Sequence, residues 1–240
     1  MSDEYLFEHP GRCPICEKRV TFVARNPWFR DNLLCPGCGS IPRERALMFC
    51  IERFLPDWSR GHVHESSPIE RGASIKLRGS ARYVASQFDP SIAPGARGAG
   101  GWVNQDLEKQ TFSDNSFDLV VTQDVFEHIF DIDAAAREIA RTLRPGGVHV
   151  FTTPLINGTK PSEPTAIREA DNSITHLVPP SYHGNPMSAD GALVTWHFGF
   201  DLASRIASVS GLPTIVVALD RLDLGIRAEF IEVFISFKLR

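Results

Sequence analysis

The 240-residue sequence contains no run of 18 or more apolar residues, and this absence excludes a membrane-spanning helix. We expect no secretory signal, because residues 1–10 are acidic and hold neither a basic stretch nor an apolar one. Neither charge dominates: the formal net charge is −4, which gives no general sign of binding to nucleic acid or to anionic membranes. Disorder is excluded too, since 42% of the residues are hydrophobic and 16 are Phe. We therefore expect a globular protein with a cytoplasmic location.

Cysteine is scarce, yet four of the five cysteines fall within 26 residues. Cys13 and Cys16 form one C-x-x-C pair, and Cys35 and Cys38 form a second pair 18 residues later. In a reducing compartment this spacing predicts a closed, four-cysteine structural zinc site rather than disulfides, because each tight turn directs two thiolates at one point. The segment is too short to build its own apolar core, so we expect the metal to supply much of its folding energy. Cys50 lies in an apolar run and is predicted to be a buried thiol.

The charge of this predicted zinc ribbon differs from that of the rest of the chain. Between His9 and Arg45 there are seven basic residues against three acidic ones, a local charge of +4 that leaves −8 elsewhere. The asymmetry permits an anionic partner, although a small ribbon also needs charged, solvated surface. Nucleic acid is therefore a possible partner but not the favoured one. We favour a role for the ribbon in domain architecture or in substrate docking.

After the ribbon, short β-like runs alternate with amphipathic helices. The predicted helices span residues 42–55, 132–143 and 200–210, and the predicted strands span 62–65, 81–86, 102–103, 117–122, 148–152, 214–219 and 229–238. Such alternation predicts an α/β fold with a parallel sheet and crossover helices. The last two strands are joined by a loop alone, which favours an antiparallel hairpin at one edge of the sheet. Pro145-Gly146-Gly147 is expected to stop the second helix and form a turn.

The chain divides into two predicted parts. Residues 1–45 form the zinc ribbon and a linker, and residues 46–240 form the α/β domain. An insertion at about 154–198 interrupts this domain, rich in Pro, Asn, His and Gly. It is too long for a plain connection in a compact domain, and such insertions are usually functional or disordered.

In an open α/β sheet, ligands bind outside the carboxyl ends of the strands, so the residues there are the candidates for a site. Several stretches in and between these elements resemble class I S-adenosylmethionine-dependent methyltransferases of type 11, namely residues 106–120, 124–128, 137–139 and 143–147. The resemblance covers residues 61–153, and residues 39–45 and 182–186 also resemble stretches of ribbon-bearing members of the family. It implies a Rossmann-like, mostly parallel seven-stranded sheet with an antiparallel last strand, and S-adenosylmethionine as the cofactor.

The resemblance also implies which residues bind that cofactor. Asp106 matches the acid that accepts a hydrogen bond from the adenine amine, and either Gln87 or Asp89 matches the residue that holds the ribose diol. The full implied set is Glu65, Ser66, Ser67, Gln87, Phe88, Asp89, Asp106, Leu107, Gln123, Asp124 and Val125. Of these, Leu107 would flank the adenine ring, and residues 123–125 would lie along the methionine moiety and the methyl group.

The first loop departs from the glycine-rich pattern of the family. Glu65 matches the acidic position before that loop, but Ser66-Ser67-Pro68 follows and no glycine occurs until Gly72. A serine hydroxyl would then bind the cofactor carboxylate directly. Pro68 removes one amide donor and is expected to hold Ser67 in extended geometry.

Two histidines are the candidate catalytic residues. His128 is expected at the start of a short helix facing the methyl group. His183, in the insertion, is the first choice of base for a hydroxyl or an amine. Together with His176, Trp196 and His197 it forms either a lid over the cofactor or a hydrated surface loop. Many methyl transfers need alignment alone, because the sulfonium is already activated.

The sequence thus predicts a methyltransferase that acts on an oxygen or a nitrogen of a small or carrier-borne substrate. The alternative is a non-catalytic, methyltransferase-like adaptor that binds a protein or nucleic acid through its zinc ribbon.

Overall fold

The computed structural model describes residues 5–185 and 188–240. Within these ranges no helix is both long enough and apolar enough to cross a membrane. Residues 1–4 of the acidic N-terminus and residues 186 and 187 of the predicted insertion lie outside the described part.

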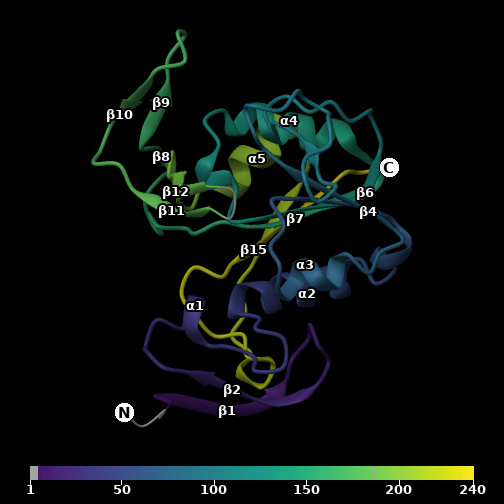
Figure 1. Ribbon diagram of the computed structural model, residues 1–240, viewed down its shortest axis with the longest axis vertical. Helices are drawn as coiled ribbons and strands as arrows, with labels where there is room; N and C mark the ends of the chain where they lie inside the picture. Colours follow the sequence, from purple (N-terminus) through teal and green to yellow (C-terminus); the bar gives the residue numbers. More distant parts are fainter. Residues whose placement is uncertain (1–4, 186–187) are drawn as a thin grey trace.

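Seven strands form the central sheet, in the spatial order β14-β15-β7-β6-β3-β4-β5 (Figure 1). Their bounds are β3 His62–Ser66, β4 Arg82–Gln87, β5 Val103–Asn104, β6 Phe117–Gln123, β7 Leu143–Thr152, β14 Thr214–Val217 and β15 Val233–Phe237. Five neighbouring strands, β5, β4, β3, β6 and β7, run parallel to one another, whereas β15 runs antiparallel to both β7 and β14. The predicted α/β sheet is therefore confirmed, including the hairpin that its two closing strands form at one edge.

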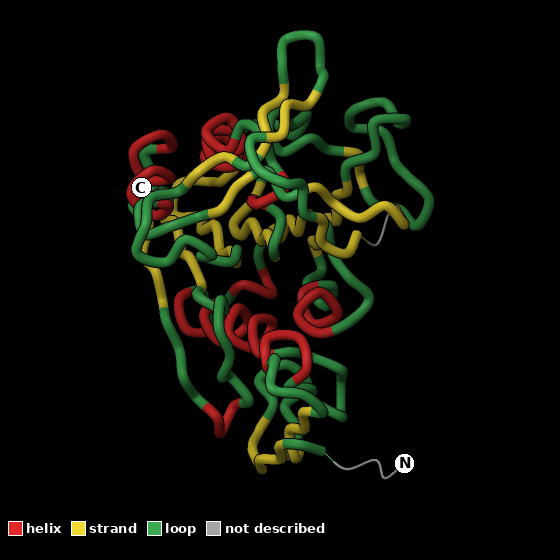
Figure 2. The backbone as a smooth tube through the Cα atoms, turned by 90° about the vertical axis from the view of Figure 1, so that its left-hand side faces the viewer, coloured by secondary structure: helices red, strands yellow, loops and turns green. Residues whose placement is uncertain are grey.

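Helices cover both faces of this sheet, with α4 (Ile132–Thr142) and α5 (Leu202–Ser210) on one side and α2 (Pro42–Phe54) and α3 (Gly72–Leu77) on the other (Figures 1 and 2). Asp131 is the N-cap of α4, and its carboxylate accepts a hydrogen bond from the amide of Ala134 at 2.8 Å. The apolar stripe of α4 is buried against the sheet, as its sequence period predicts. The strands between these layers are buried on both faces, which explains the nearly continuous apolar run in β6.

The end of α4 differs from the prediction. The helix stops at Thr142, but Pro145-Gly146-Gly147 does not form a separate turn, because β7 begins at once at Leu143 and runs through it. The pairing with β6 shifts register at this point, so the glycines form an irregularity inside the strand. Gly146 has a φ of +83°, and its amide donates to the carbonyl of Lys238 at 2.7 Å. Pairing with the C-terminal segment thus keeps this glycine-rich stretch in the sheet.

The cysteine-rich ribbon lies at one end of the molecule (Figure 1). Its regular elements are β1 (Phe7–Arg12), β2 (Arg19–Ala24) and α1 (Phe29–Asn32). Its apolar residues belong to the same hydrophobic cluster as residues of α2, the sheet and the loop between β14 and β15. The fully buried Arg45 strengthens this packing, since its guanidinium donates to the carbonyls of Leu33 and Gly225 at 2.7 Å. Ribbon and sheet therefore share one core, and the boundary at residue 45 stays a prediction.

The insertion contains three short antiparallel pairs. These are β8 (Glu163–Pro164) with β13 (Trp196–His197), β9 (Ala166–Arg168) with β10 (Ile174–His176), and β11 (Tyr182–Asn185) with β12 (Ser188–Leu193). The β9–β10 hairpin projects from the body of the molecule (Figures 1 and 2). The β11–β12 pair lies closer to the sheet, where it contributes to the wall of a cavity.

Candidate functional site

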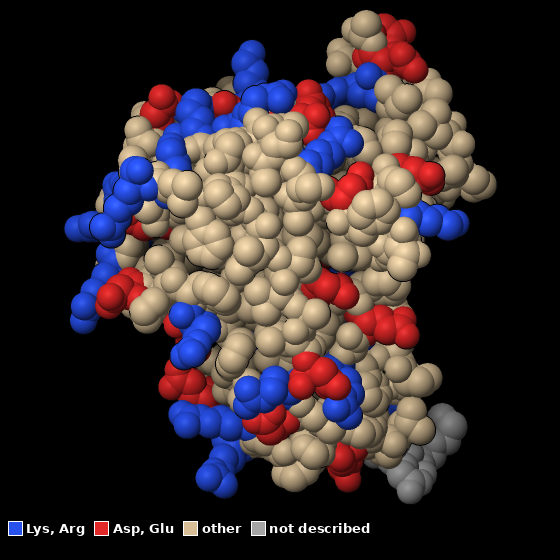
Figure 3. Space-filling model, turned by 180° about the vertical axis from the view of Figure 1, so that it is seen from behind, with Lys and Arg blue, Asp and Glu red and all other residues tan. Residues whose placement is uncertain are grey.

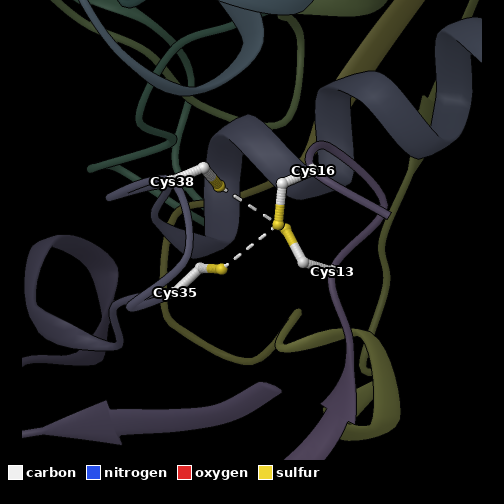
Figure 4. Close-up of side chains that lie close together, drawn as sticks. All are labelled: Cys13, Cys16, Cys35 and Cys38. Carbon is white, nitrogen blue, oxygen red and sulfur yellow. Dashed lines mark hydrogen bonds between the residues drawn. The ribbon is translucent and has the colours of Figure 1, made fainter. Parts of the chain in front are cut away.

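The four ribbon cysteines converge on one point (Figure 4). Their sulfur atoms all lie within 4.8 Å of one another, with Cys13 Sγ 3.8 Å from Cys38 Sγ and Cys16 Sγ 3.7 Å from Cys35 Sγ. A tetrahedral zinc ion with Zn–S bonds of about 2.3 Å requires neighbouring sulfurs to be about 3.8 Å apart. The donor set therefore fits a structural zinc ion.

A cavity of about 810 Å³ lies at the carboxyl ends of the central strands. Nine of the eleven residues predicted to bind the cofactor line it, together with both candidate histidines. These lining residues are Ser66, Ser67, Gln87, Phe88, Asp106, Leu107, Gln123, Asp124, Val125, His128 and His183. Glu65 and Asp89 are not among its lining residues.

Glu65 is completely buried beneath the first loop. Its carboxylate accepts hydrogen bonds from Ser74 Oγ at 2.6 Å, Tyr83 Oη at 2.7 Å and Gln123 Nε2 at 2.8 Å. Burial outweighs these bonds and raises the pKa of Glu65. In this arrangement Glu65 ties together three neighbouring segments below the cavity.

The two candidates for the ribose diol lie in different surroundings. Asp89 is partly buried, and its carboxylate accepts from the amide and the hydroxyl of Ser91, at 2.9 and 2.6 Å. Gln87 is buried at the end of β4 and lines the cavity. Of the two alternatives, Gln87 is the one that the fold brings to the cavity.

The backbone of the first loop corrects the prediction for Ser67. Its φ is +56°, in the left-handed region rather than the expected extended one, and its amide donates to the carbonyl of Ser86 at 2.8 Å. This amide therefore supports the neighbouring strand. Gly72 begins α3 with a φ of +54°, and a Cβ there would overlap the carboxylate of Glu44 from α2. The loop thus needs its glycine where α2 packs against it.

Asp106 follows β5 and is partly buried. One of its oxygens accepts the amide of Glu108 at 2.9 Å, and burial raises the pKa of the carboxyl. The other oxygen accepts no hydrogen bond from the residues that the structure describes. Leu107 is buried beside it, and Phe88 is 57% exposed.

Two arginines in this wall were not identified from the sequence. Arg30 of α1 donates to Asp124 Oδ2 at 2.6 Å, and Arg43 Nε of α2 lies 3.0 Å from the same oxygen. Thr152 Oγ1 donates to the other oxygen of Asp124 at 2.9 Å. Burial opposes ionisation of Asp124, but the guanidiniums of Arg43 and Arg30 outweigh it and hold the pKa below its usual range. No local pattern marks these arginines, because they meet Asp124 only in the folded chain.

The candidate histidines meet in the same wall. The ring centroids of His128 and His183 are 5.0 Å apart, and their planes are nearly perpendicular. Burial lowers the pKa of both imidazoles, which favours their neutral forms. The neighbouring carboxyl of Glu127 was not predicted as a site residue, although it precedes His128 in the resembling motif. Burial, followed by the charge of Asp124, raises the pKa of Glu127 to about 8.

Comparisons with known proteins show which family and which fold the chain resembles. Residues 73–151 match the family model described as "Methyltransferase domain". A 112-residue segment is 34% identical to the ubiquinone biosynthesis O-methyltransferase of Sinorhizobium fredii, covering 40% of this chain but only 44% of that relative. Among solved structures, an S-adenosylmethionine-dependent methyltransferase from Mesorhizobium loti superposes with a TM-score of 0.51 and 16% identity, over 80% of this chain and 97% of the other. This structural likeness concerns the fold alone.

Proposed function

We propose that the chain is a class I S-adenosylmethionine-dependent methyltransferase, which transfers a methyl group to an oxygen or a nitrogen of a small or carrier-borne substrate; the match to a methyltransferase domain supports this. The observation that carries this proposal is the convergence of the predicted residues. Nine of the eleven residues named for cofactor binding and both histidines named for catalysis line one cavity, although they come from different strand ends and from the insertion. Its volume of about 810 Å³ is in the range of small-molecule sites.

The cavity offers suitable polar groups for the cofactor. Asp106 retains a carboxylate oxygen for the adenine amine, and Gln87 takes the place of the diol-binding residue in preference to Asp89. The serine at position 66 lines the cavity near the expected carboxylate of the methionine moiety. When bound, S-adenosylmethionine supplies a methyl group on an already activated sulfonium. The protein then has to align that group with the acceptor and exclude water.

His128 and His183 remain the proposed catalytic residues. Both histidines line the same cavity as Gln123 and Val125, which are proposed to lie along the methyl group. An acceptor placed beside the methyl group would therefore contact the imidazole rings. The β11–β12 pair that carries His183 closes this side of the cavity, which supports its role as a lid.

Calorimetric titration with S-adenosylhomocysteine tests the proposal. We expect saturable binding, and a loss of about tenfold or more in affinity for Asp106→Asn, because a charged hydrogen-bond acceptor is removed. Asp89→Asn is the matched control and should bind like the unaltered protein, since the carboxylate of Asp89 is bound by Ser91 and Asp89 is not a lining residue of the cavity. Absence of binding at millimolar concentration would overturn the proposal.

We further propose that the ribbon holds structural zinc through Cys13, Cys16, Cys35 and Cys38. The sulfur separations support this donor set. By ordering the ribbon, the ion would keep Arg30 and Arg43 against Asp124 in the wall of the cavity.

The alternative of an adaptor that binds nucleic acid has less support. Three of the seven basic residues in the ribbon segment are mostly or fully buried and bind groups of the protein itself, namely Arg30, Arg43 and Arg45. On the face in Figure 3, positive and negative side chains of the lower part of the molecule are intermixed. A continuous basic track for phosphates does not cover that face. The cytoplasmic location stays a prediction.

A further inference from the structure

Three side chains with metal-binding atoms converge beside the cavity. Glu127 and His128 belong to the short helix η2 (Phe126–His128), and His183 belongs to β11 of the insertion. One ligand atom from each lies within 4.8 Å of the other two, and Glu127 Oε1 is 3.7 Å from His183 Nδ1. Segments more than 50 residues apart thus bring a carboxylate and two imidazoles together.

Glu127 carries an unsatisfied oxygen. The residue is 1% exposed, and its Oε2 accepts from Thr153 Oγ1 at 2.8 Å. Its Oε1 is buried and has no hydrogen-bond partner within residues 5–185 and 188–240. Burying a carboxylate oxygen without a partner is costly, and buried charges are normally paired or bound to a metal.

The available cations do not fill this role. Arg30 and Arg43 reach the same wall, but their guanidiniums are engaged by Asp124 and Asp31. His183 Nδ1 lies 3.7 Å from Glu127 Oε1, which is close enough for an ion pair but too far for a hydrogen bond. Glu127 Oε1 is therefore left without a hydrogen-bonded cation among the described residues, while a nitrogen of each imidazole lies within 4.8 Å of a carboxylate oxygen of Glu127.

His128 is oriented as a metal ligand would be. Its Nδ1 lies 2.8 Å from the carbonyl oxygen of Leu193. A carbonyl only accepts, so Nδ1 carries the proton and Nε2 keeps its lone pair. Metal-binding histidines commonly donate their second ring nitrogen to a backbone carbonyl, and metal-binding carboxylates are commonly held by a further hydrogen bond. His128 has the first feature, and Glu127 has the second through Thr153.

We propose that Glu127, His128 and His183 bind a divalent transition-metal ion whose remaining positions face the cavity and take an oxygen of the methyl acceptor. Two imidazoles and one carboxylate favour zinc, cobalt, iron or manganese over magnesium and calcium, which prefer oxygen ligands alone. This site is separate from the ribbon cysteines. The statement about the acceptor rests on the proposed methyltransferase function, whereas the metal site itself does not.

The metal narrows the class of acceptor to oxygen. An amine bound to a metal has committed its lone pair, while a bound hydroxyl group becomes more acidic and still retains lone pairs. The acceptor hydroxyl would give its proton to water, and its oxygen would form the new bond to the methyl carbon. The electron pair of the breaking carbon–sulfur bond would stay on sulfur, which leaves a neutral thioether. The imidazoles would then hold the metal rather than remove the proton themselves.

Titration of the zinc-loaded protein with Co²⁺, followed by visible absorption, tests the site. We expect one additional Co²⁺ per chain without the thiolate-to-cobalt bands that replacement of the ribbon zinc would produce. His183→Ala and Glu127→Gln should each weaken Co²⁺ binding about tenfold or more. His176→Ala, an exposed histidine of β10 in the same insertion, is the matched control and should not change it.

Titration of S-adenosylhomocysteine into the same preparations separates the two proposals and reports whether the variants fold. Two results would overturn the metal site: no Co²⁺ binding beyond the ribbon site, or Co²⁺ binding by His183→Ala that equals binding by the unaltered protein. If S-adenosylhomocysteine still binds in these preparations, the proposed function is left standing. Co²⁺ binding without S-adenosylhomocysteine binding would support the metal site and overturn the proposed function. Acetohydroxamate, which binds metals through two oxygens, should shift the Co²⁺ bands, and an unchanged spectrum would overturn the open positions proposed for the acceptor.

Discussion

At the scale of single residues, Asp124 is the carboxylate that pairs with two arginines in the wall of the cavity. It has a φ of +50°, which is unfavourable for a residue with a Cβ, although Asp tolerates it better than most. Arg30, Arg43 and Thr152 bind its carboxylate, so the positions of the two guanidiniums and of the end of β6 are coupled through Asp124. Such a buried pair is costly to break, because the remaining partner keeps an uncompensated charge.

Replacing Arg30 with methionine should therefore lower the free energy of unfolding by about 2–4 kcal/mol. Arg43 still faces Asp124 in this variant, which limits the loss. Urea unfolding measures the difference. The control is Arg60→Met, because the pair of Arg60 with Asp57 is exposed on both sides and should contribute less than about 1 kcal/mol. Equal losses in the two variants would contradict the importance of the Arg30–Asp124 pair.

At the scale of elements, the contact of β1 with the 3₁₀ helix η3 (Leu222–Leu224) joins the ribbon to the loop between β14 and β15. The strand can approach so closely because Gly11 has no side chain. A Cβ at this position would overlap the carbonyl oxygen of Asp223 and the ring of Phe22. A backbone oxygen in a packed loop cannot move aside as the end of a flexible side chain can.

Gly11→Ala should accordingly destabilise the protein by about 1–3 kcal/mol, as overpacking does elsewhere. Thermal or urea unfolding provides the measurement. Gly184→Ala serves for comparison, because a Cβ there meets no atom within 4 Å among the described residues, and its effect should be within about 0.5 kcal/mol. A neutral Gly11→Ala would show that β1 and η3 are not packed as closely as described.

At the scale of the whole molecule, the ribbon is part of the wall of the cavity as well as a terminal module. Trp28, Arg30 and Asp31 come from the ribbon, and all three line the cavity beside residues of the sheet domain. The hydrophobic cluster that contains Cys13 and Cys35 extends to residues of the central strands. Loss of the proposed zinc ion should therefore disturb both stability and ligand binding.

Cys38→Ala should remove the bound zinc, lower the melting temperature and weaken the binding of S-adenosylhomocysteine. Zinc analysis, thermal unfolding and calorimetry measure these three effects. The control is Cys50→Ala. Burial raises the pKa of the Cys50 thiol to about 12, so it stays protonated, and its loss should leave one zinc per chain. If Cys38→Ala kept its zinc, the four-cysteine site would be contradicted.

Much of the fold could be predicted from local patterns. The buried strand β6 and the apolar stripe of α4 have periods that a short stretch of sequence displays, and the Cys pairs have a spacing that turns impose. Pro145-Gly146-Gly147 misled the prediction, because pairing with the C-terminal segment keeps this glycine-rich stretch within β7. The insertion has no comparable period, so its three strand pairs were not predicted.

The sequence by itself determined the seven strands of the central sheet, the four-cysteine cluster and eleven of the residues that line the cavity. These follow from periodicity, from ligand spacing, and from the family resemblance together with the rule that sites lie at strand ends. Only the tertiary structure decided that Gln87 rather than Asp89 lines the cavity, and that Arg30 and Arg43 pair with Asp124. It alone placed His183 beside Glu127 and His128. The reason is physical: these groups are distant along the chain, and their contacts depend on packing and charge pairing that no local stretch of sequence contains.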